Sequence, residues 1–324
     1  MRGGAPAELV SACRETLEGS IDRNGGDALL LSGGLDTNII AYVAARRSKP
    51  ECYTVAFPPA EAPDVPFARS TAERLGLPWN LVELAPSLLH DRLREVIGVL
   101  RTFDPMEVRN SVAIYHGLEA ARRRGASAVM TGDAADELFA GYRFTFELEP
   151  AEMTRRLREM WRVMHFSSKP MAASLGMSAS LPYLDPEVVG FAELLEPGHL
   201  VGLRGGKKYG KLILRQAFVR LIGAKNAWRV KTPIEYGSGT THLQRYFSAR
   251  FTDTEFAELK GEALADGVKI RDKEHLEYYR IYREWFPAPS AQAKTERRCP
   301  DCGADVLQGS TFCVTCGAYP IANA

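Results

Sequence analysis

The sequence predicts an α/β protein with a doubly wound parallel sheet, a mostly helical C-terminal half and a small cysteine-rich end. Short apolar runs alternate with segments of helical length up to residue 131, which is the pattern of parallel strands joined by right-handed crossovers. The run at 52–57 is continuously apolar, as a strand buried on both faces should be. In such sheets, ligands bind beyond the carboxyl ends of the strands.

The predicted elements follow one another in a regular order. Strands are expected at 28–31, 52–57, 79–84 and 128–131. Helices are expected before, between and after them at 7–18, 35–47, 62–75, 86–100, 110–124, 152–163, 211–222 and 272–285. Pro86 stands at an allowed first-turn position, and Gly125 closes the helix before the fourth strand. The aromatic stripe on the last helix is expected to be packing rather than a ligand site.

The turn after the first strand is rich in glycine and leads into a helix. Its residues are Leu31-Ser32-Gly33-Gly34, so backbone N–H groups can face an anion at a helix N-terminus. Ser32 and Thr37 can add hydroxyl donors, whereas the charge of Asp36 indicates a cation between it and any phosphate. An ordinary strand-to-helix turn is the alternative. The motif resembles the pyrophosphate loop of ATP pyrophosphatases, and it lacks the Gly-Lys-Ser/Thr of a Walker loop.

Three carboxylates follow the strand at 128–131. Asp133, Asp136 and Glu137 lie close together in the sequence, between Gly132 and Gly141. Carboxylates so close would repel one another unless a divalent cation or a cationic ligand compensated them. A solvated acidic turn is the alternative, but the buried strand and the flanking glycines favour a functional site.

Five segments in order resemble the synthetase domain of asparagine synthetases and the related β-lactam synthetases. The resemblance runs from about residue 8 to residue 240, within the ATP pyrophosphatase superfamily, whose nucleotide-binding domain has a HUP-like fold. One such motif could arise by chance, whereas several in the same order indicate a relationship. The segments are 32–37, 132–142, 171–185, 207–218 and 228–233.

This resemblance implies an AMP-forming ligase that makes a C–N bond, as in asparagine biosynthesis. A carboxylate, expected to be aspartate, would attack the α-phosphate of ATP, and ammonia would then displace AMP. Asp36 and Asp136 would hold Mg²⁺, and Lys211 matches the lysine that neutralises the α-phosphate and then the tetrahedral intermediate. Asp133 and Tyr142 match positions that line the same pocket.

The nucleotide-binding set implied by the resemblance includes residues beyond the two acidic positions. Arg109 is a weaker candidate for a phosphate contact, and a surface arginine at a helix N-terminus is the alternative. Leu31 and Val55 would contact the adenosine. The remaining members are the pyrophosphate-loop residues Ser32, Gly33, Gly34, Asp36 and Thr37, together with Gly132 of the acidic turn.

The chain also departs from the family pattern. It begins Met1-Arg2 rather than with the catalytic cysteine of a glutaminase domain, so free ammonia or a separate glutaminase subunit is expected to supply nitrogen. Segment 178–180 reads Ser-Ala-Ser where the family often has Glu-x-Arg, which weakens the case for aspartate. Asp133 stands where the family often has Glu or another residue, and Ala134 and Ala140 replace common glycines.

Two Cys-x-x-Cys-Gly knuckles near the C-terminus predict a zinc ribbon. The ligands would be Cys299, Cys302, Cys313 and Cys316, and four thiolates leave no open coordination position, so the Zn²⁺ would be structural. The predicted domains are therefore 1–286 and 299–324, joined by a linker at 287–298. Lys294, Arg297 and Arg298 suit a docking or RNA-contacting role for the ribbon, and a folded cap is the alternative.

Composition sets outer bounds on function. Hydrophobic residues make up 45% and charged residues 25% of the chain, as in a globular protein, and a net charge of +1 argues against a nucleic-acid footprint over the whole chain. No apolar stretch approaches membrane-spanning length and no secretory signal is visible, so we expect a cytoplasmic protein. The alternatives are an ATP-dependent tRNA-modifying enzyme and a nucleotide-binding subunit without catalysis.

Overall fold

The computed structural model describes residues 5–322, which form two compact units. Within the described residues, unit 1 comprises segments 5–55, 63–82 and 117–233, and unit 2 comprises 56–62, 83–116 and 234–322. The division falls within the long helix α5 (Pro105–Arg123). The predicted linker at 287–298 contains the short helix α17 (Pro289–Gln292).

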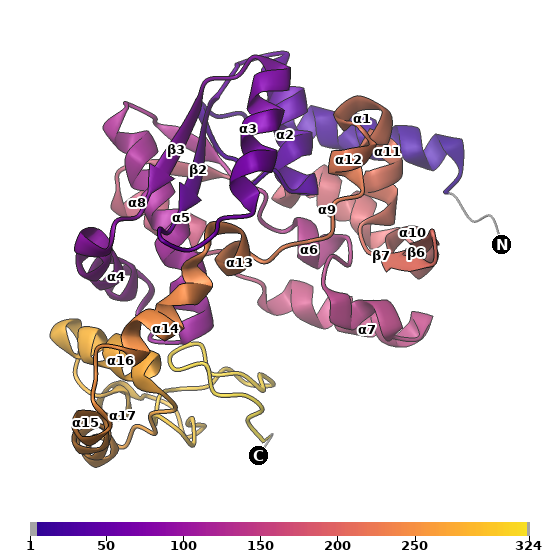
Figure 1. The fold of residues 1–324 in the computed structure, drawn as a ribbon. Helices are drawn as coiled ribbons and strands as arrows, with labels where there is room; N and C mark the ends of the chain where they lie inside the picture. The colour runs from indigo at the N-terminus through magenta and orange to yellow at the C-terminus, as the bar shows by residue number, and fades with distance from the viewer. Residues whose placement is uncertain (1–4, 323–324) are drawn as a thin grey trace. The chain divides into compact units, whose positions relative to one another are not determined.

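Unit 1 is organised around a five-stranded sheet with the order β3-β2-β1-β4-β5. Strand β1 pairs in parallel with β2 and β4, and β4 pairs in parallel with β5, so the predicted fold class is confirmed. Figure 1 shows β2 and β3 as neighbouring arrows beside α2 and α3. The bounds are β1 (Ala28–Leu30), β2 (Glu51–Ala56), β3 (Trp79–Glu83), β4 (Ala128–Met130) and β5 (Ser178–Ser180).

The strand order places a topological switch point between β1 and β4. The chain passes outward from β1 to β2 and β3, and then returns to place β4 on the other side of β1. The loops that leave β1 and β4 therefore diverge from adjacent strand ends, which is where open α/β sheets bind ligands. These loops are the glycine-rich turn and the acidic turn.

The helices of unit 1 cover this sheet and build the apolar core. Helix α2 is buried over most of its surface, because it is apolar nearly all round and packs against α1, α3 and α11. The bounds are α1 (Ala7–Arg23), α2 (Leu35–Ala45), α3 (Asp64–Leu75), α6 (Ala135–Leu138), α7 (Pro150–Val163), α8 (Ser168–Ser174), α9 (Pro186–Glu193), α10 (Pro197–Leu200), α11 (Leu212–Ile222) and α12 (Ala224–Ala227). A hairpin of β6 (Gly202–Arg204) and β7 (Lys207–Tyr209) precedes α11.

Unit 2 is helical apart from its C-terminal segment. Its aromatic core confirms the packing expected for the last long helix, because Phe103 lies 5.1 Å, centroid to centroid, from both Tyr279 and Tyr282 of α16. The bounds are α4 (Pro86–Leu100), α13 (Ile234–Ser238), α14 (Leu243–Ser248), α15 (Asp253–Ala265) and α16 (Lys273–Trp285), with α17 and part of α5 as given above.

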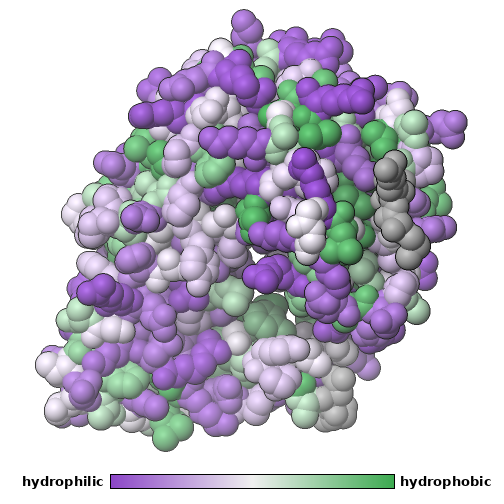
Figure 2. All heavy atoms as spheres, turned by 45° about the vertical axis from the view of Figure 1, so that its right-hand side comes forward, coloured by the Kyte–Doolittle hydropathy of each residue, from purple (hydrophilic) through white to green (hydrophobic). Residues whose placement is uncertain are grey.

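The surface is polar on the face shown in Figure 2, where hydrophobic side chains occur in small groups among hydrophilic ones. Within residues 5–322, no helix combines the length and the apolar character that crossing a bilayer requires.

Candidate functional site

The glycine-rich loop after β1 is held in shape by its own side chains. Gly33 has a φ of +67°, and a Cβ there would lie 2.5 Å from the backbone nitrogen of Ala68, so only glycine fits. The amide of Asn38 donates to the carbonyls of Gly33 at 2.8 Å and Gly34 at 2.9 Å. The loop leads directly into α2, so it lies at the positive end of that helix.

The acidic loop after β4 approaches the glycine-rich loop closely. A Cβ on Gly132 would lie 3.2 Å from the Thr37 methyl and 3.3 Å from Asp36 Cβ. Ala134 and Ala140 have φ values of +73° and +51°, in the left-handed region that favours glycine. The two alanines that replace common family glycines therefore keep a glycine-like backbone and carry its strain.

Lys211 lies between the two predicted metal ligands. Its Nζ is 2.6 Å from Asp36 Oδ2 and 2.8 Å from Asp136 Oδ1. The Lys211 side chain is 3% exposed, and each aspartate side chain is 18% exposed. The structure thus brings together three residues that are far apart in the sequence and that the resemblance had grouped.

The charged groups of this cluster shift one another's pKa values. Burial alone would lower the pKa of Lys211, but Asp136 and Asp36 outweigh it and raise that pKa, so the ammonium stays protonated. Burial would raise the pKa of Asp136, but Lys211 and Lys231 together lower it. Burial and the neighbouring Asp136 raise the pKa of Asp36 despite the opposing effect of Lys211.

A second lysine faces the cluster, and sequence reasoning did not single it out. Lys231 Nζ lies 3.7 Å from Asp136 Oδ2 and 4.7 Å from the centre of the Tyr142 ring. Its side chain is 30% exposed, about ten times the exposure of Lys211. The available signal was its place in the fifth family-like segment, 228–233.

Tyr142 and Asp133 have different partners. The Tyr142 hydroxyl donates to Glu137 Oε1 at 2.6 Å, and burial together with Glu137 raises the pKa of this tyrosine. Asp133 Oδ2 accepts a hydrogen bond from Ser168 at the start of α8. Glu137, the third carboxylate of the acidic turn, therefore serves to orient Tyr142.

The three remaining predicted nucleotide contacts, Leu31, Val55 and Arg109, lie in different surroundings. Leu31 is buried, and its backbone donates to Tyr53 and accepts from Thr54. Val55 lies at the end of β2. Arg109 belongs to unit 2, where its guanidinium pairs with the buried Glu274 at 2.7 Å, so the structure gives it a partner other than phosphate.

The cluster contains oxygen atoms that suit a hard cation. Asp36 Oδ1 is buried and accepts no hydrogen bond within the described residues, and Asp136 Oδ1 lies 2.8 Å from the Lys211 ammonium. Mg²⁺ prefers oxygen ligands of this kind. The residues present therefore fit the magnesium site that the resemblance implies.

The four C-terminal cysteines converge as a zinc site requires. Their sulfur atoms all lie within 4.8 Å of one another, with 3.6 Å between Cys299 and Cys316 and 3.8 Å between Cys302 and Cys313. Tetrahedral Zn²⁺ with Zn–S bonds of about 2.3 Å places sulfurs about 3.8 Å apart. Both knuckles close alike, because the N–H groups of Gly303 and Gly317 donate to the carbonyls of Cys299 and Cys313, respectively.

The cysteine knuckles are part of unit 2. Phe103 N donates to Thr315 O at 2.8 Å, and Arg271 donates to the carbonyls of Cys316 and Gly317. Arg297, one of the basic residues expected to contact RNA, instead donates to the carbonyls of Leu307 and Ser310. These contacts favour the folded-cap interpretation of the cysteine segment.

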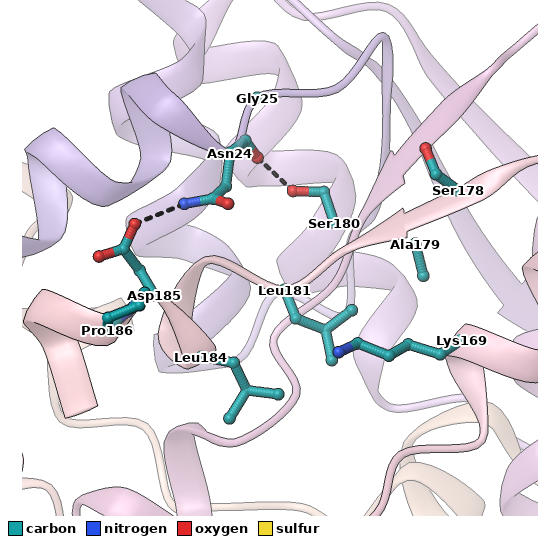
Figure 3. A pocket seen from close by; sticks show the side chains of 10 residues that line it. All are labelled: Asn24, Gly25, Lys169, Ser178, Ala179, Ser180, Leu181, Leu184, Asp185 and Pro186. Atoms are coloured by element: carbon teal, nitrogen blue, oxygen red, sulfur yellow. Dashed lines mark hydrogen bonds between the residues drawn. The ribbon is translucent and has the colours of Figure 1, made fainter.

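A separate cavity of about 380 Å³ lies along β5 (Figure 3) and contains none of the predicted site residues. Ser180 donates to the Asn24 carbonyl, and the Asn24 amide donates to Asp185 at 2.8 Å. Asp185 is also paired with Arg23 at 2.8 Å. Much of the polar lining is thus occupied by internal hydrogen bonds.

Comparisons with known proteins agree with the motifs. Residues 27–169 match the asparagine synthase family model. A probable glutamine-hydrolysing asparagine synthetase of Dictyostelium discoideum is 26% identical over 92% of this chain and 59% of its own length. Asparagine synthetase B of Escherichia coli K12, also glutamine-hydrolysing, is 25% identical over 88% of this chain and 54% of its own length.

The chain thus spans somewhat more than half the length of these two relatives. Among solved structures, NMN synthetase from Francisella tularensis is 14% identical, with a TM-score of 0.36 over 87% of this chain and 94% of that one. The predicted resemblance to the synthetase domain of asparagine synthetases is confirmed by the family model and the curated relatives.

Proposed function

We propose that this chain, whose residues 27–169 match the asparagine synthase family, is an ATP-dependent ligase that converts a carboxylate into an amide. The carboxylate is activated as an acyl-adenylate and is then amidated by ammonia, with release of pyrophosphate and AMP. Aspartate is the first acceptor to test, because the two relatives described above are asparagine synthetases.

The observation that carries the proposal is the charge cluster at the switch point of the sheet. Two carboxylates from different loops share one buried lysine, and a second, more exposed lysine stands beside them. Both reaction steps place negative charge on phosphate oxygens or on a tetrahedral carbon. Fixed cations and N–H donors stabilise such charge best in a preorganised site with little water.

The chemistry balances in two steps. A carboxylate oxygen attacks the α-phosphorus of ATP, the bond between the α-phosphorus and the bridging oxygen breaks, and pyrophosphate leaves. Ammonia then attacks the acyl carbon, the bond to the AMP oxygen breaks, and nitrogen loses a proton. AMP departs with one oxygen of the original carboxylate.

Each group in the cluster has a role that follows from its position. The N–H groups of loop 32–37 bind the pyrophosphate portion of ATP. Asp36 and Asp136 hold Mg²⁺, which supplies neutralisation of phosphate charge when bound. Lys231 neutralises the α-phosphate and the tetrahedral intermediate.

The sequence prediction gave this last role to Lys211. Lys211 is buried between two carboxylates, whereas Lys231 is partly exposed and lies beside a single carboxylate. We therefore assign Lys211 to holding the carboxylate pair in place and Lys231 to contacting the substrate. Tyr142, oriented by Glu137, supports Lys231 through its ring.

The proposal also includes a nitrogen source and a cellular compartment. Free ammonia or a separate glutaminase subunit supplies the nitrogen, and the reaction takes place in the cytoplasm. Ser178 and Ser180 line the β5 cavity and bond to backbone carbonyls. They present no charge to an acceptor, so acceptors other than aspartate belong in the assay.

The test measures pyrophosphate and AMP released from ATP, Mg²⁺ and ammonium, with and without aspartate and other carboxylates. We expect release that requires a carboxylate and produces AMP rather than ADP. Lys231→Ala should abolish it, and Lys208→Ala, at an exposed lysine paired with Glu147, should leave it unchanged. Release that needs tRNA instead of a small carboxylate would replace this proposal with the tRNA-modifying alternative.

A further inference from the structure

Arg215 of α11 is a buried arginine whose hydrogen bonds all go to backbone carbonyls. The residue is 4% exposed. Its Nε donates to Gly210 O at 2.7 Å, and its NH1 donates to Ala227 O at 2.7 Å and to Arg229 O at 3.1 Å. One side chain therefore joins two backbone segments that are separated in the sequence.

These two segments carry the two lysines of the charge cluster. Gly210 directly precedes Lys211, and Arg229 lies two residues before Lys231. We propose that Arg215 is a positioning residue that sets both lysines against Asp36 and Asp136. This deepens the function proposed above for the same site and rests on it.

The backbone at Lys211 needs such support because it is strained. Lys211 has a φ of +55°, in a region that side chains other than glycine rarely adopt. Its N–H donates to Phe139 O at 2.9 Å, and a Cβ on Gly210 would lie 2.0 Å from Ala140 O. Strained backbone persists where surrounding contacts over-determine it, and Arg215 supplies one of these contacts.

The second segment is linked onward to the pyrophosphate loop. Arg229 donates to Ser32 O at 3.1 Å and to Asp64 Oδ1 at 2.6 Å, and its guanidinium lies 4.0 Å from the centre of the Phe67 ring. Arg215 holds the carbonyl of this same residue. The position of Lys231 is thereby tied to the loop that would bind the phosphates.

Only a guanidinium can make this set of contacts. Its planar fork donates in several fixed directions at once, whereas an ammonium is a point charge on a flexible stem. In Arg215→Lys, the ammonium keeps the positive charge near the two aspartates but reaches fewer of the three carbonyls. The variant therefore separates positioning from charge.

The first measurement is hydrogen exchange by mass spectrometry on Arg215→Lys, which needs no activity. We expect faster exchange in both segments, 207–212 and 227–232, with segment 86–100 of unit 2 unchanged. Arg220→Lys, at an exposed arginine on the same helix, is the control and should change neither segment. Faster exchange in one segment alone, in neither, or throughout the chain would overturn the proposal.

The second measurement is steady-state kinetics of pyrophosphate release per folded molecule. We expect kcat of Arg215→Lys to fall about 100-fold, with KM for ATP changed much less, because small misplacements of reacting groups have effects of this size. A purely structural role would lower the folded fraction and leave kcat per folded molecule unchanged. Failure of both Arg215→Lys and Arg215→Gln to fold would assign Arg215 to global stability and overturn the proposal.

The two measurements separate the two proposals. If the wild-type protein releases no pyrophosphate, the proposed function fails while the exchange measurement still decides the role of Arg215. If the wild type is active and Arg215→Lys matches it in kcat, the positioning role fails alone.

Discussion

Lys211 and Lys231 belong to the same charge cluster but differ in burial, and this difference suits them to different roles. Lys211 is enclosed by two carboxylates, which raise its pKa and keep it charged. Lys231 is more exposed and contacts one carboxylate at a longer distance. The first residue is suited to maintaining the site, and the second is suited to meeting a substrate.

Replacing Lys211 should therefore lower the free energy of unfolding more than replacing Lys231 does. Lys211→Met leaves Asp36 and Asp136 facing each other in a largely buried place, and removing one partner of a buried ion pair costs about 3–5 kcal/mol. We expect a loss of this size in the free energy of unfolding, measured by urea denaturation at pH 7. Lys231→Met should lose less than about 1 kcal/mol, because its pair is partly exposed. Equal losses in the two variants would contradict the division of roles.

The sequence predicts which segments meet at the candidate site better than it predicts the partners of individual side chains. The spacing around Asp36 and Asp136 predicts their convergence because both follow buried parallel strands. The partners of Arg109 and Tyr142 could not be predicted in this way, because Arg109 meets a helix far along the chain and Tyr142 turns toward Glu137. Apart from its place in segment 228–233, Lys231 has no local pattern that separates it from the other lysines.

At the scale of elements, regular periodicity predicts most of what the structure contains. The four expected strands and the eight expected helices occur, because their apolar residues follow the period of each element. However, α1 ends five residues later and α5 begins five residues earlier than expected, and the 13-residue helix α15 was not expected. Strand β5 escapes prediction because Ser178, Ala179 and Ser180 are small residues without strand preference. It forms because β4 offers it an open edge, which is tertiary information.

Helix α16 contains a buried carboxylate, Glu274, that makes the free energy of unfolding depend on pH. Burial raises the pKa of Glu274 to about 7, against the opposing effect of Arg109 at 2.7 Å and Tyr278 at 2.8 Å. The folded state thus binds this proton more tightly than the unfolded state. The contribution of Glu274 to the free energy of unfolding is fully present below about pH 4.5. It is lost as the pH rises to about 7, and the total loss is at most about 3 kcal/mol.

Glu274→Gln should remove this dependence. We expect the free energy of unfolding of the wild type, from urea titrations at pH 5 and pH 7.5, to fall more steeply with pH than that of the variant. Glu258→Gln, at an exposed position on α15, is the control and should keep the wild-type slope. Identical slopes in wild type and Glu274→Gln would show that this carboxylate does not titrate in that range.

The cysteine knuckles should stabilise the elements that they contact. We expect one zinc ion per chain by mass spectrometry of the metal content, and a lower melting temperature for unit 2 once a chelator removes it. Cys313→Ser should lose the metal, whereas Cys13→Ala, at a buried cysteine of α1, should retain it. Purified protein that holds no zinc after folding in its presence would contradict a zinc site.

At the scale of the whole molecule, the chain separates two tasks. Unit 1 brings the glycine-rich loop, the acidic loop and the two lysines together at the switch point of its sheet. Unit 2 contains the cysteine knuckles and the Arg109–Glu274 pair. The order of the motifs in the sequence predicts the site in unit 1. It does not predict unit 2, because this unit assembles from three segments that share no continuous pattern.

The central claim is that the cluster of Asp36, Asp136, Lys211 and Lys231 activates a carboxylate by adenylation. The most direct measurement uses the carboxylate that supports pyrophosphate release, labelled with ¹⁸O in its carboxyl group, together with ATP, Mg²⁺ and ammonium. The account predicts that AMP acquires one ¹⁸O atom for each amide formed. Unlabelled AMP, or label found in inorganic phosphate, would contradict it.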